Sequence, residues 1–366
     1  MTGPRTDTLP DVTLEMLYRL LGLQDHESGR ELIRRGRLVS PRLPQLLISA
    51  AAREGVPLGT GTRDELSRAR TRAETYADLY DAVRAAVPGV RIAKGPSVAR
   101  WYPPDLLRPV GDLDLGLETE DELWRAARTV ADRAPVEDVD LALTRYEGRT
   151  DVTLGLKWPA EDALLDRPYS VELSTVAFPG DLDGTVPPRF ALPADQTLAD
   201  LLSLAEERFQ RPFHAKDAVD VLMILTHRPP DPATLAEAAE AHLLAPELLE
   251  LLTYVQDGAQ APLDSYRTPL SAPAAAELAR RKATPRPAGP HDTTTVDGRL
   301  DAGIPVAGLR LNRRQSPVDR AVRHDTDGVG LLRTPLGDFL LVCGEVVSRA
   351  DHATALAALD RLEATR

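Results

Sequence analysis

Two aspartates with alternate spacing, Asp112 and Asp114, are the residues of this sequence best placed to do chemistry. They alternate with Leu113, Leu115 and Leu117, and side chains two residues apart on a β-strand share a face. The leucines would then pack on helices and leave both carboxylates exposed. Two carboxylates so close together repel each other, and a divalent cation with oxygen ligands relieves the repulsion. The spacing therefore predicts a site for Mg²⁺ or Mn²⁺.

A turn that contains glycine precedes this pair and is suited to a phosphate group. The segment 94–97, Lys-Gly-Pro-Ser, follows a short apolar run at 90–93 that predicts a strand. Gly95 lets a phosphate approach the backbone closely, and the hydroxyl of Ser97 can donate a hydrogen bond to it. The turn and the paired acids together predict a site for a phosphate group and a metal.

A third acid from another strand would complete the metal site. Glu172 stands between Val171 and Leu173, so that the two apolar side chains face the core while the carboxylate faces outward. Asp151, in a neighbouring predicted strand, is the alternative third acid. Three acids suffice for one or two magnesium ions that polarise an α-phosphate and help to deprotonate an attacking hydroxyl.

The tripeptide D-x-D also occurs elsewhere in this acidic chain, so the tripeptide alone decides little. The other pairs are Asp138/Asp140, Asp181/Asp183 and Asp325/Asp327. The last two stand beside glycines and predict turns, whereas the first alternates like a half-buried strand. Only the pair at 112 and 114 follows both the glycine turn and an arginine, Arg108, at suitable spacing. We therefore favour that pair.

The segments Lys94-Gly95, Tyr102-Pro103 and 108–115 (Arg-Pro-Val-Gly-Asp-Leu-Asp-Leu) resemble the uncharacterised nucleotidyltransferase family of the polymerase-beta-like superfamily. The resemblance extends over roughly residues 60–260. The sequence departs from the family pattern at Pro96, which interrupts the usual Gly-Gly or Gly-Ser turn. It departs again at Ser174, where the family often has a histidine.

The resemblance implies a role for each matching residue. It implies that Asp112, Asp114 and Glu172 are the metal ligands and the catalytic acids. It also implies that a nucleoside triphosphate (NTP) is bound by Lys94, Gly95, Ser97, Arg108 and Lys216, the last in a helix at 214–221 like the basic-acidic helix of such enzymes. For Arg108, orienting the acids or forming a salt bridge are alternatives to a phosphate contact.

The implied reaction transfers a nucleoside monophosphate from an NTP to a hydroxyl acceptor and releases pyrophosphate. The acceptor stays open between a small molecule, a peptide and a protein, with transfer RNA as the alternative, as in toxin-type nucleotidyltransferases. The alternative from another class is a non-catalytic binding or scaffold protein on the same fold.

Composition limits the partners of the chain. The net charge of −12 argues against wholesale binding of nucleic acid, although a basic run at 310–323, which includes Arg313 and Arg314, leaves RNA possible but not favoured. Cys343 is the only cysteine, which excludes an intramolecular disulfide and a thiolate-rich zinc site. No apolar run is long enough to cross a membrane and no signal peptide is evident, so we expect a cytoplasmic protein without a membrane partner.

The periodicity of the 366 residues predicts an α+β fold, a nucleotidyltransferase-like mixed β-sheet with flanking helices. Strands are predicted at 111–117, 136–146, 151–157 and 169–176, and helices at 63–86, 120–133, 198–209, 215–226, 233–244 and 246–255. The expected parts are an N-terminal helical region (1–60), a catalytic core (61–185), a helical domain (186–282), a linker (283–297) and a small C-terminal α/β accessory domain (298–366).

Overall fold

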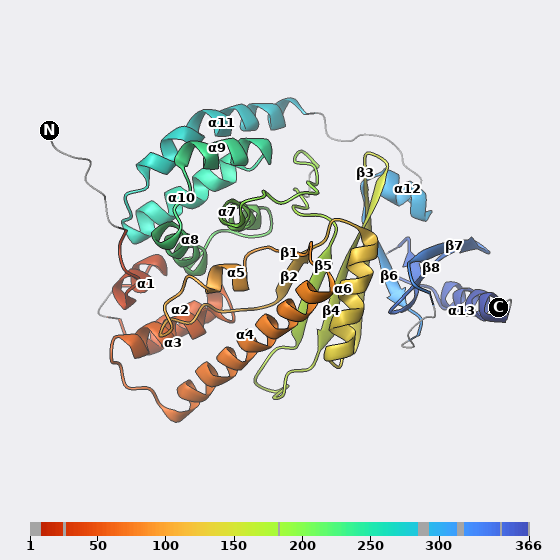
Figure 1. The fold of residues 1–366 in the computed structure, drawn as a ribbon, viewed down its shortest axis with the longest axis horizontal. Helices are drawn as coiled ribbons and strands as arrows, with labels where there is room; N and C mark the ends of the chain where they lie inside the picture. Colours follow the sequence, from red (N-terminus) through yellow and green to blue (C-terminus); the bar gives the residue numbers. More distant parts are fainter. Residues whose placement is uncertain are drawn as a thin grey trace.

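The structure is a computed structural model, and it describes residues 9–24, 27–181, 184–284, 293–312, 318–344 and 346–364. These residues form an α+β fold in which helices surround a mixed β-sheet (Figure 1). The predicted α+β class and the mixed sheet are therefore confirmed.

The helices are α1 (Leu14–Leu20), α2 (Gly29–Val39), α3 (Leu43–Arg53), α4 (Thr60–Ala86), α5 (Pro96–Ala99), α6 (Glu120–Arg133), α7 (Gln196–Glu206), η1 (Glu207–Phe209), α8 (Ala215–His227), α9 (Pro232–Ala241), α10 (Ala245–Ala259), α11 (Asp264–Ala283), α12 (Val296–Asp301) and α13 (Arg349–Ala364). The strands are β1 (Arg91–Ile92), β2 (Leu113–Gly116), β3 (Asp138–Tyr146), β4 (Arg149–Trp158), β5 (Tyr169–Ser174), β6 (Val306–Arg310), β7 (Val322–Thr326), β8 (Val329–Thr334) and β9 (Gly337–Val342).

The described strands join in a nine-stranded sheet with the order β1-β2-β5-β4-β3-β6-β9-β8-β7. Neighbouring strands run antiparallel except β2 and β5, which run parallel. In that parallel pair Leu113 lies opposite Val171, and Asp114 lies opposite Glu172. Because the side chains of such partners point to the same face, the apolar pair enters the core while the acidic pair faces away from it.

Helices α4 and α6 pack together and against the face of the sheet that carries the buried leucines (Figure 1). Tyr76 of α4 and Trp124 of α6 are fully buried there with Leu113 and Leu154. Helix α6 begins with a reciprocal capping box between Thr119 and Glu122, the third residue of the helix, and this local signal stabilises helix starts. This packing holds β2 in place. The face of β2 that carries Asp114 is turned away from α4 and α6.

The helices α1, α3 and α7 to α11 enclose a second apolar core, which includes Leu17, Leu47 and Leu222. Helix α7 approaches the sheet from the side opposite α4 and α6 (Figure 1). The candidate site lies where this helical part meets the acidic face of the sheet.

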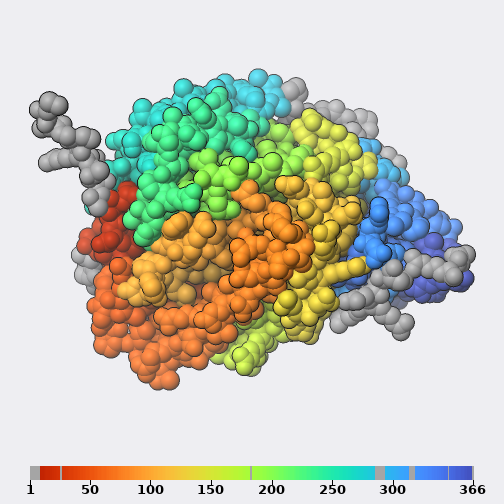
Figure 2. Space-filling view, in the orientation of Figure 1, coloured from red at the N-terminus to blue at the C-terminus, as the bar shows by residue number. Residues whose placement is uncertain are grey.

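The C-terminal strands continue the sheet, because β6 pairs with the outer edge of β3. Val306 and Phe339 are fully buried in the same core as Leu141 and Leu154. In the space-filling view these strands and α13 occupy one end of the molecule, and the N-terminal helices occupy the other (Figure 2). The described part of residues 298–366 is thus joined to the rest by hydrogen bonds and by core packing, while the division of the chain into five parts stays a prediction.

Most predicted elements are present, and the missed ones have physical causes. The strands predicted in the catalytic core and the helices at 63–86 and 120–133 are confirmed within a few residues. Helix α11 was not predicted, because Pro269 and Pro273 stand inside it. Strands β6 and β7 flank the basic run, whose residues Arg313 and Arg314 lie outside the described part of the chain. Among the described helices none is both long and apolar enough to cross a membrane.

Candidate functional site

The predicted acids are brought together on one face of the sheet. Asp114 of β2 and Glu172 of β5 are register partners, and Asp112 comes directly before β2 with the alternation that the sequence predicts. Leu113 and Leu115 are buried on the opposite face. The sequence predicts that Asp112 and Asp114 share one face and that Glu172 joins them from another strand, and the three carboxylates have this arrangement.

Burial and neighbouring carboxylates raise the pKa of two acids of the cluster, Asp114 and Glu172. Burial, opposed by Lys94 and reinforced by Asp112 and Glu172, raises the pKa of Asp114 to about 7. Burial and the nearby Asp112 likewise raise the pKa of Glu172. The fold therefore disfavours the ionised forms of Asp114 and Glu172, and a bound cation would favour them.

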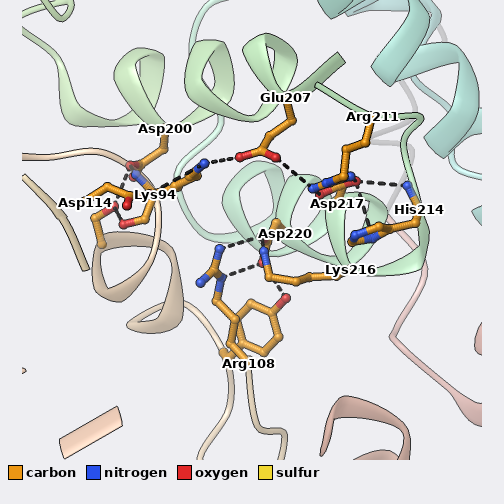
Figure 3. Close-up of polar contacts among 12 residues, drawn as sticks. Lys94, Arg108, Asp114, Asp200, Glu207, Arg211, His214, Lys216, Asp217 and Asp220 are labelled. Atoms are coloured by element: carbon orange, nitrogen blue, oxygen red, sulfur yellow. Dashed lines mark hydrogen bonds and ion pairs between the residues drawn. The ribbon is translucent and has the colours of Figure 1, made fainter. Parts of the chain in front are cut away.

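Lys94 provides a cation inside this cluster. Its Nζ lies 3.6 Å from Oδ2 of Asp114 and forms an ion pair with Glu207 of η1 (Figure 3). Burial acts to lower the pKa of Lys94, but Asp114 and Glu207 raise it above its usual range. The ammonium is thus fixed in its charged form beside the acids.

The turn that delivers Lys94 has an unusual backbone, and a buried carboxylate holds it. Lys94 and Gly95 both have positive φ, at 51° and 61°. Asp200 of α7, fully buried, accepts a 3.1 Å hydrogen bond from the Lys94 amide and further ones from Ser97 and Gln196. The turn therefore keeps its shape through α7, an element far along the chain.

The expected contact of Ser97 with a phosphate does not fit this geometry. Its side chain is buried, and its hydroxyl donates to the carbonyl of Lys94 at 2.9 Å and to Asp200. Ser97 lines neither of the two cavities described below. We therefore assign Ser97 to holding the turn.

Arg108, for which a phosphate contact stays a prediction, is bound to a buried carboxylate and also lines the polar cavity described below. Its Nε and Nη2 each donate a 2.7 Å hydrogen bond to Asp220 of α8, and both side chains are buried (Figure 3). Tyr102 and Lys216 donate to the same carboxylate at 2.6 and 3.0 Å. Although burial alone would raise it, Arg108 and Lys216 hold the pKa of Asp220 far below its usual range.

This group fixes the loop before β2 to helix α8. The salt bridge anticipated as an alternative for Arg108 is present, and Arg108 is a positioning residue. Lys216 keeps its amino group at the wall of the cavity described below. Burial, reinforced by the neighbouring Arg108, lowers its pKa.

Several side chains at the site were missed by the sequence reasoning. Arg42, at the start of α3, reaches over Gly111, where an added Cβ would lie 1.8 Å from its Nη1. Arg211 pairs with Glu207 at 3.2 Å and with Asp217 at 2.7 Å (Figure 3). Arg42 is a helix cap and Arg211 lies in the loop after η1, and neither stands in a recognisable motif, so no signal in the sequence links them to the acids.

Two cavities meet at the carboxylate cluster. The first, of about 320 Å³, is lined by many charged residues, and we call it the polar chamber; its cations include Arg42, Lys94, Arg211 and Lys216. The second, of about 270 Å³, has a largely apolar wall, and we call it the apolar chamber. Both chambers are lined by Lys94, Asp114, Glu172, Glu207 and Gln210.

The alternative acids lie outside these chambers. Asp151 is buried, accepts hydrogen bonds from Arg149 at 2.7 Å and Thr175 at 3.0 Å, and lines neither chamber. Asp140 is exposed and forms an ion pair with Lys157. Of the two candidates for the third acid, the geometry brings Glu172 to the pair.

The cluster has the ligand atoms that a magnesium or manganese ion prefers, but the side chains are too far apart to hold one as they stand. Carboxylate oxygens from adjacent strands are the ligands that such ions prefer. Within the described ranges, however, no three acidic, histidine or cysteine side chains are gathered closely enough to hold a metal. Lys94 is paired with both Asp114 and Glu207, so a metal bound there would share Asp114 with the ammonium.

Comparisons of the chain with protein-family models, with curated proteins and with solved structures found no match.

Proposed function

We propose that this protein is a metal-dependent nucleotidyltransferase, which transfers a nucleoside monophosphate from an NTP to a hydroxyl acceptor and releases pyrophosphate. The observation that carries the proposal is the register pair of Asp114 and Glu172, with Asp112 on the same face, at the wall of a chamber rich in cations. Acids beside cations are what a magnesium-bound triphosphate requires.

The cations of the polar chamber supply the affinity for phosphate. Arg42 and Arg211 have planar guanidinium groups, which bind phosphate oxygens in pairs, and Lys216 has an ammonium. Arg211 and Lys216 are paired with Asp217 and Asp220, so a phosphate would share these cations with the carboxylates. They come from separate elements, α3, the loop after η1 and α8. Binding of the triphosphate would therefore hold the helical part and the sheet together.

In this proposal Asp112, Asp114 and Glu172 hold the metal, Mg²⁺ or Mn²⁺. When bound, such an ion polarises the α-phosphate and lowers the pKa of a coordinated hydroxyl. The residues of the chain position the NTP, keep Lys94 charged beside the acids, and accept the acceptor's proton on Asp114 or Glu172. Asp200 and Asp220 act through the turn and the loop that they hold.

The finer fold is part of the proposal too. The parallel β2–β5 pair and the helix that covers its leucines support a nucleotidyltransferase-like core. The nine-stranded sheet is wider than is typical of the polymerase-beta-like superfamily, because β6 to β9 extend it. The extension lies at the edge away from β2 and contributes none of its described residues to either chamber.

The test is to find where a labelled nucleotide goes. The purified protein is incubated with magnesium, each of the four NTPs labelled at the α-phosphate, and a lysate of the source organism. We expect label to enter one acceptor fraction with the wild type and not with Asp114→Asn, while Asp140→Asn behaves as the wild type. If no fraction gains label with any NTP, or if Asp114→Asn labels equally, the proposal is wrong.

A further inference from the structure

We infer that the apolar chamber is the acceptor site and that it takes a small hydroxylated molecule with an apolar body and no anionic group. The inference rests on the proposed function and deepens it, because it selects among the acceptors left open above. Three observations carry it, namely the place of the chamber, the chemistry of its wall and its size.

The place of the chamber follows from the geometry of phosphoryl transfer. The attacking and leaving oxygens stand roughly in line on opposite sides of the phosphorus. If the pyrophosphate end of the NTP lies among Arg42, Arg211 and Lys216 in the polar chamber, the acceptor approaches from the opposite side of Asp114 and Glu172. The apolar chamber opens onto these same carboxylates.

The balance of the step is simple. The acceptor oxygen forms a bond to the α-phosphorus, and the bond from that phosphorus to the bridging oxygen of the β-phosphate breaks. Pyrophosphate leaves through the polar chamber. The hydroxyl proton passes to Asp114 or Glu172, both of which line the two chambers.

The wall of the chamber is unsuited to an anionic acceptor. Phe178, Pro188 and Leu192 supply apolar surface, and Thr153 and Ser174 supply hydroxyl groups. Its lining cation is Lys94, which is already paired with Asp114 and Glu207. An RNA acceptor depends on free cationic surface to bind its phosphates, and this wall offers none among its described lining residues.

The size of the chamber also favours a small molecule. Its volume of about 270 Å³ lies just below the usual range of small-molecule sites, roughly 300–1,000 Å³. It would hold a compact ring or a short branched chain whose hydroxyl reaches the carboxylates.

Two variants reduce the space in this chamber without touching the acids. Thr153→Trp places a large ring in it from β4. Gly116→Ala adds a single methyl group, which would lie 3.7 Å from Leu192 in ordinary contact and should leave the fold intact. Thr150→Trp, an exposed position on the same strand, is the matched control.

The test is saturation-transfer NMR of the full-length protein, loaded with magnesium and a non-hydrolysable NTP analogue, against hydroxylated fragments at millimolar concentration. The fragments form matched sets, such as tyramine, tyrosol and 4-hydroxyphenylacetate, which share a phenol and differ in charge. A single-stranded RNA oligonucleotide is included. We expect signals from neutral and cationic fragments, weakened at least threefold by Gly116→Ala and lost in Thr153→Trp, but kept in Thr150→Trp.

The inference is overturned if no fragment binds, if only the anionic fragments or the RNA bind, or if both chamber variants bind the fragments as the wild type does. Affinity for the NTP analogue is measured separately in each variant by calorimetry. Failure of the wild type to bind the analogue would refute the proposed function, whereas unchanged analogue binding with unchanged fragment binding in both chamber variants would refute the acceptor site alone.

Discussion

Asp114 is the residue whose ionisation the fold opposes most clearly. Its pKa is raised from 3.8 to about 7, so the folded protein holds this proton to a higher pH than the unfolded chain does. The contribution of the protonated form to stability is therefore complete below about pH 4 and is lost as the pH rises to about 7. Asn at this position cannot ionise and avoids the loss.

We therefore predict that Asp114→Asn is more stable than the wild type at pH 8, by about 2 kcal/mol once solvent screening is allowed for, and equally stable at pH 4. Urea unfolding without divalent cations at both pH values measures the difference. Asp138→Asn, at an exposed position, serves as the control and should show no such pH dependence. If the free energies of unfolding of Asp114→Asn and the wild type differ by the same amount at both pH values, the raised pKa of Asp114 is contradicted.

Asp220 is a residue whose loss should lower the stability of the fold. Removing it leaves Arg108 buried without its partner and takes away a hydrogen bond from Tyr102. We predict that Asp220→Ala lowers the free energy of unfolding by about 3–5 kcal/mol. Asp140→Ala breaks an exposed pair with Lys157 and should cost less than about 1 kcal/mol. Equal losses in the two variants, measured by chemical unfolding, would count against a buried anchoring role.

The sequence predicts the acids of the site, but it does not predict the side chains that surround them. Asp112, Asp114 and Glu172 obey a short-range rule, the alternation of side chains along a strand, and their convergence follows once two strands pair. Arg42 and Glu207 obey no such rule. Their place depends on how helices distant in the chain pack on the sheet, which local patterns do not encode.

Among the elements, the turn at Lys94 and Gly95 is the one whose shape the site needs most. Gly95 has φ 61° and ψ −124°, a conformation that side chains with a Cβ avoid, although no atom lies within 4 Å of the position that a Cβ would take. We predict that Gly95→Ala costs about 1–3 kcal/mol through backbone strain alone and moves Lys94 away from the acids.

Gly61 provides the matched control for the turn, because it lies in α4 with open space around it and ordinary φ. Gly61→Ala should stabilise the protein by up to about 1 kcal/mol, since alanine favours a helix. Thermal unfolding of both variants measures the contrast. A Gly95→Ala protein as stable as Gly61→Ala would show that the turn carries no strain.

Helix α11 shows why some elements escape prediction. Pro269 and Pro273 normally end or bend a helix, so the local pattern argues against one there. Tertiary contacts favour it nevertheless, because Arg281 pairs with Glu277 within the helix and with Glu247 of α10. Helix α6, by contrast, has a capping box and regular periodicity, and it was predicted at the residues where it is found.

Across the molecule, the continuity of the sheet predicts that the C-terminal residues cannot be removed without harm. Truncation after residue 297 would expose the edge of β3 and remove Val306 and Phe339 from the core that also holds Leu141. We expect the truncated chain to aggregate or to melt well below the full chain, because an unpaired strand edge and lost core packing both destabilise. Circular dichroism melting and light scattering measure this. A truncated chain that melts at the same temperature would support an independent accessory domain.

Binding of an NTP at the carboxylate cluster is the step on which the proposed reaction depends. Calorimetric titration of the full chain with non-hydrolysable analogues of the four NTPs, with and without magnesium, measures it. We predict that at least one analogue binds with a Kd between about 1 μM and 1 mM. That binding should require magnesium, fall at least tenfold in the Asp112→Ala/Asp114→Ala variant, and persist in Asp138→Ala/Asp140→Ala. No binding by the wild type, or equal affinity in both double variants, would contradict the proposal.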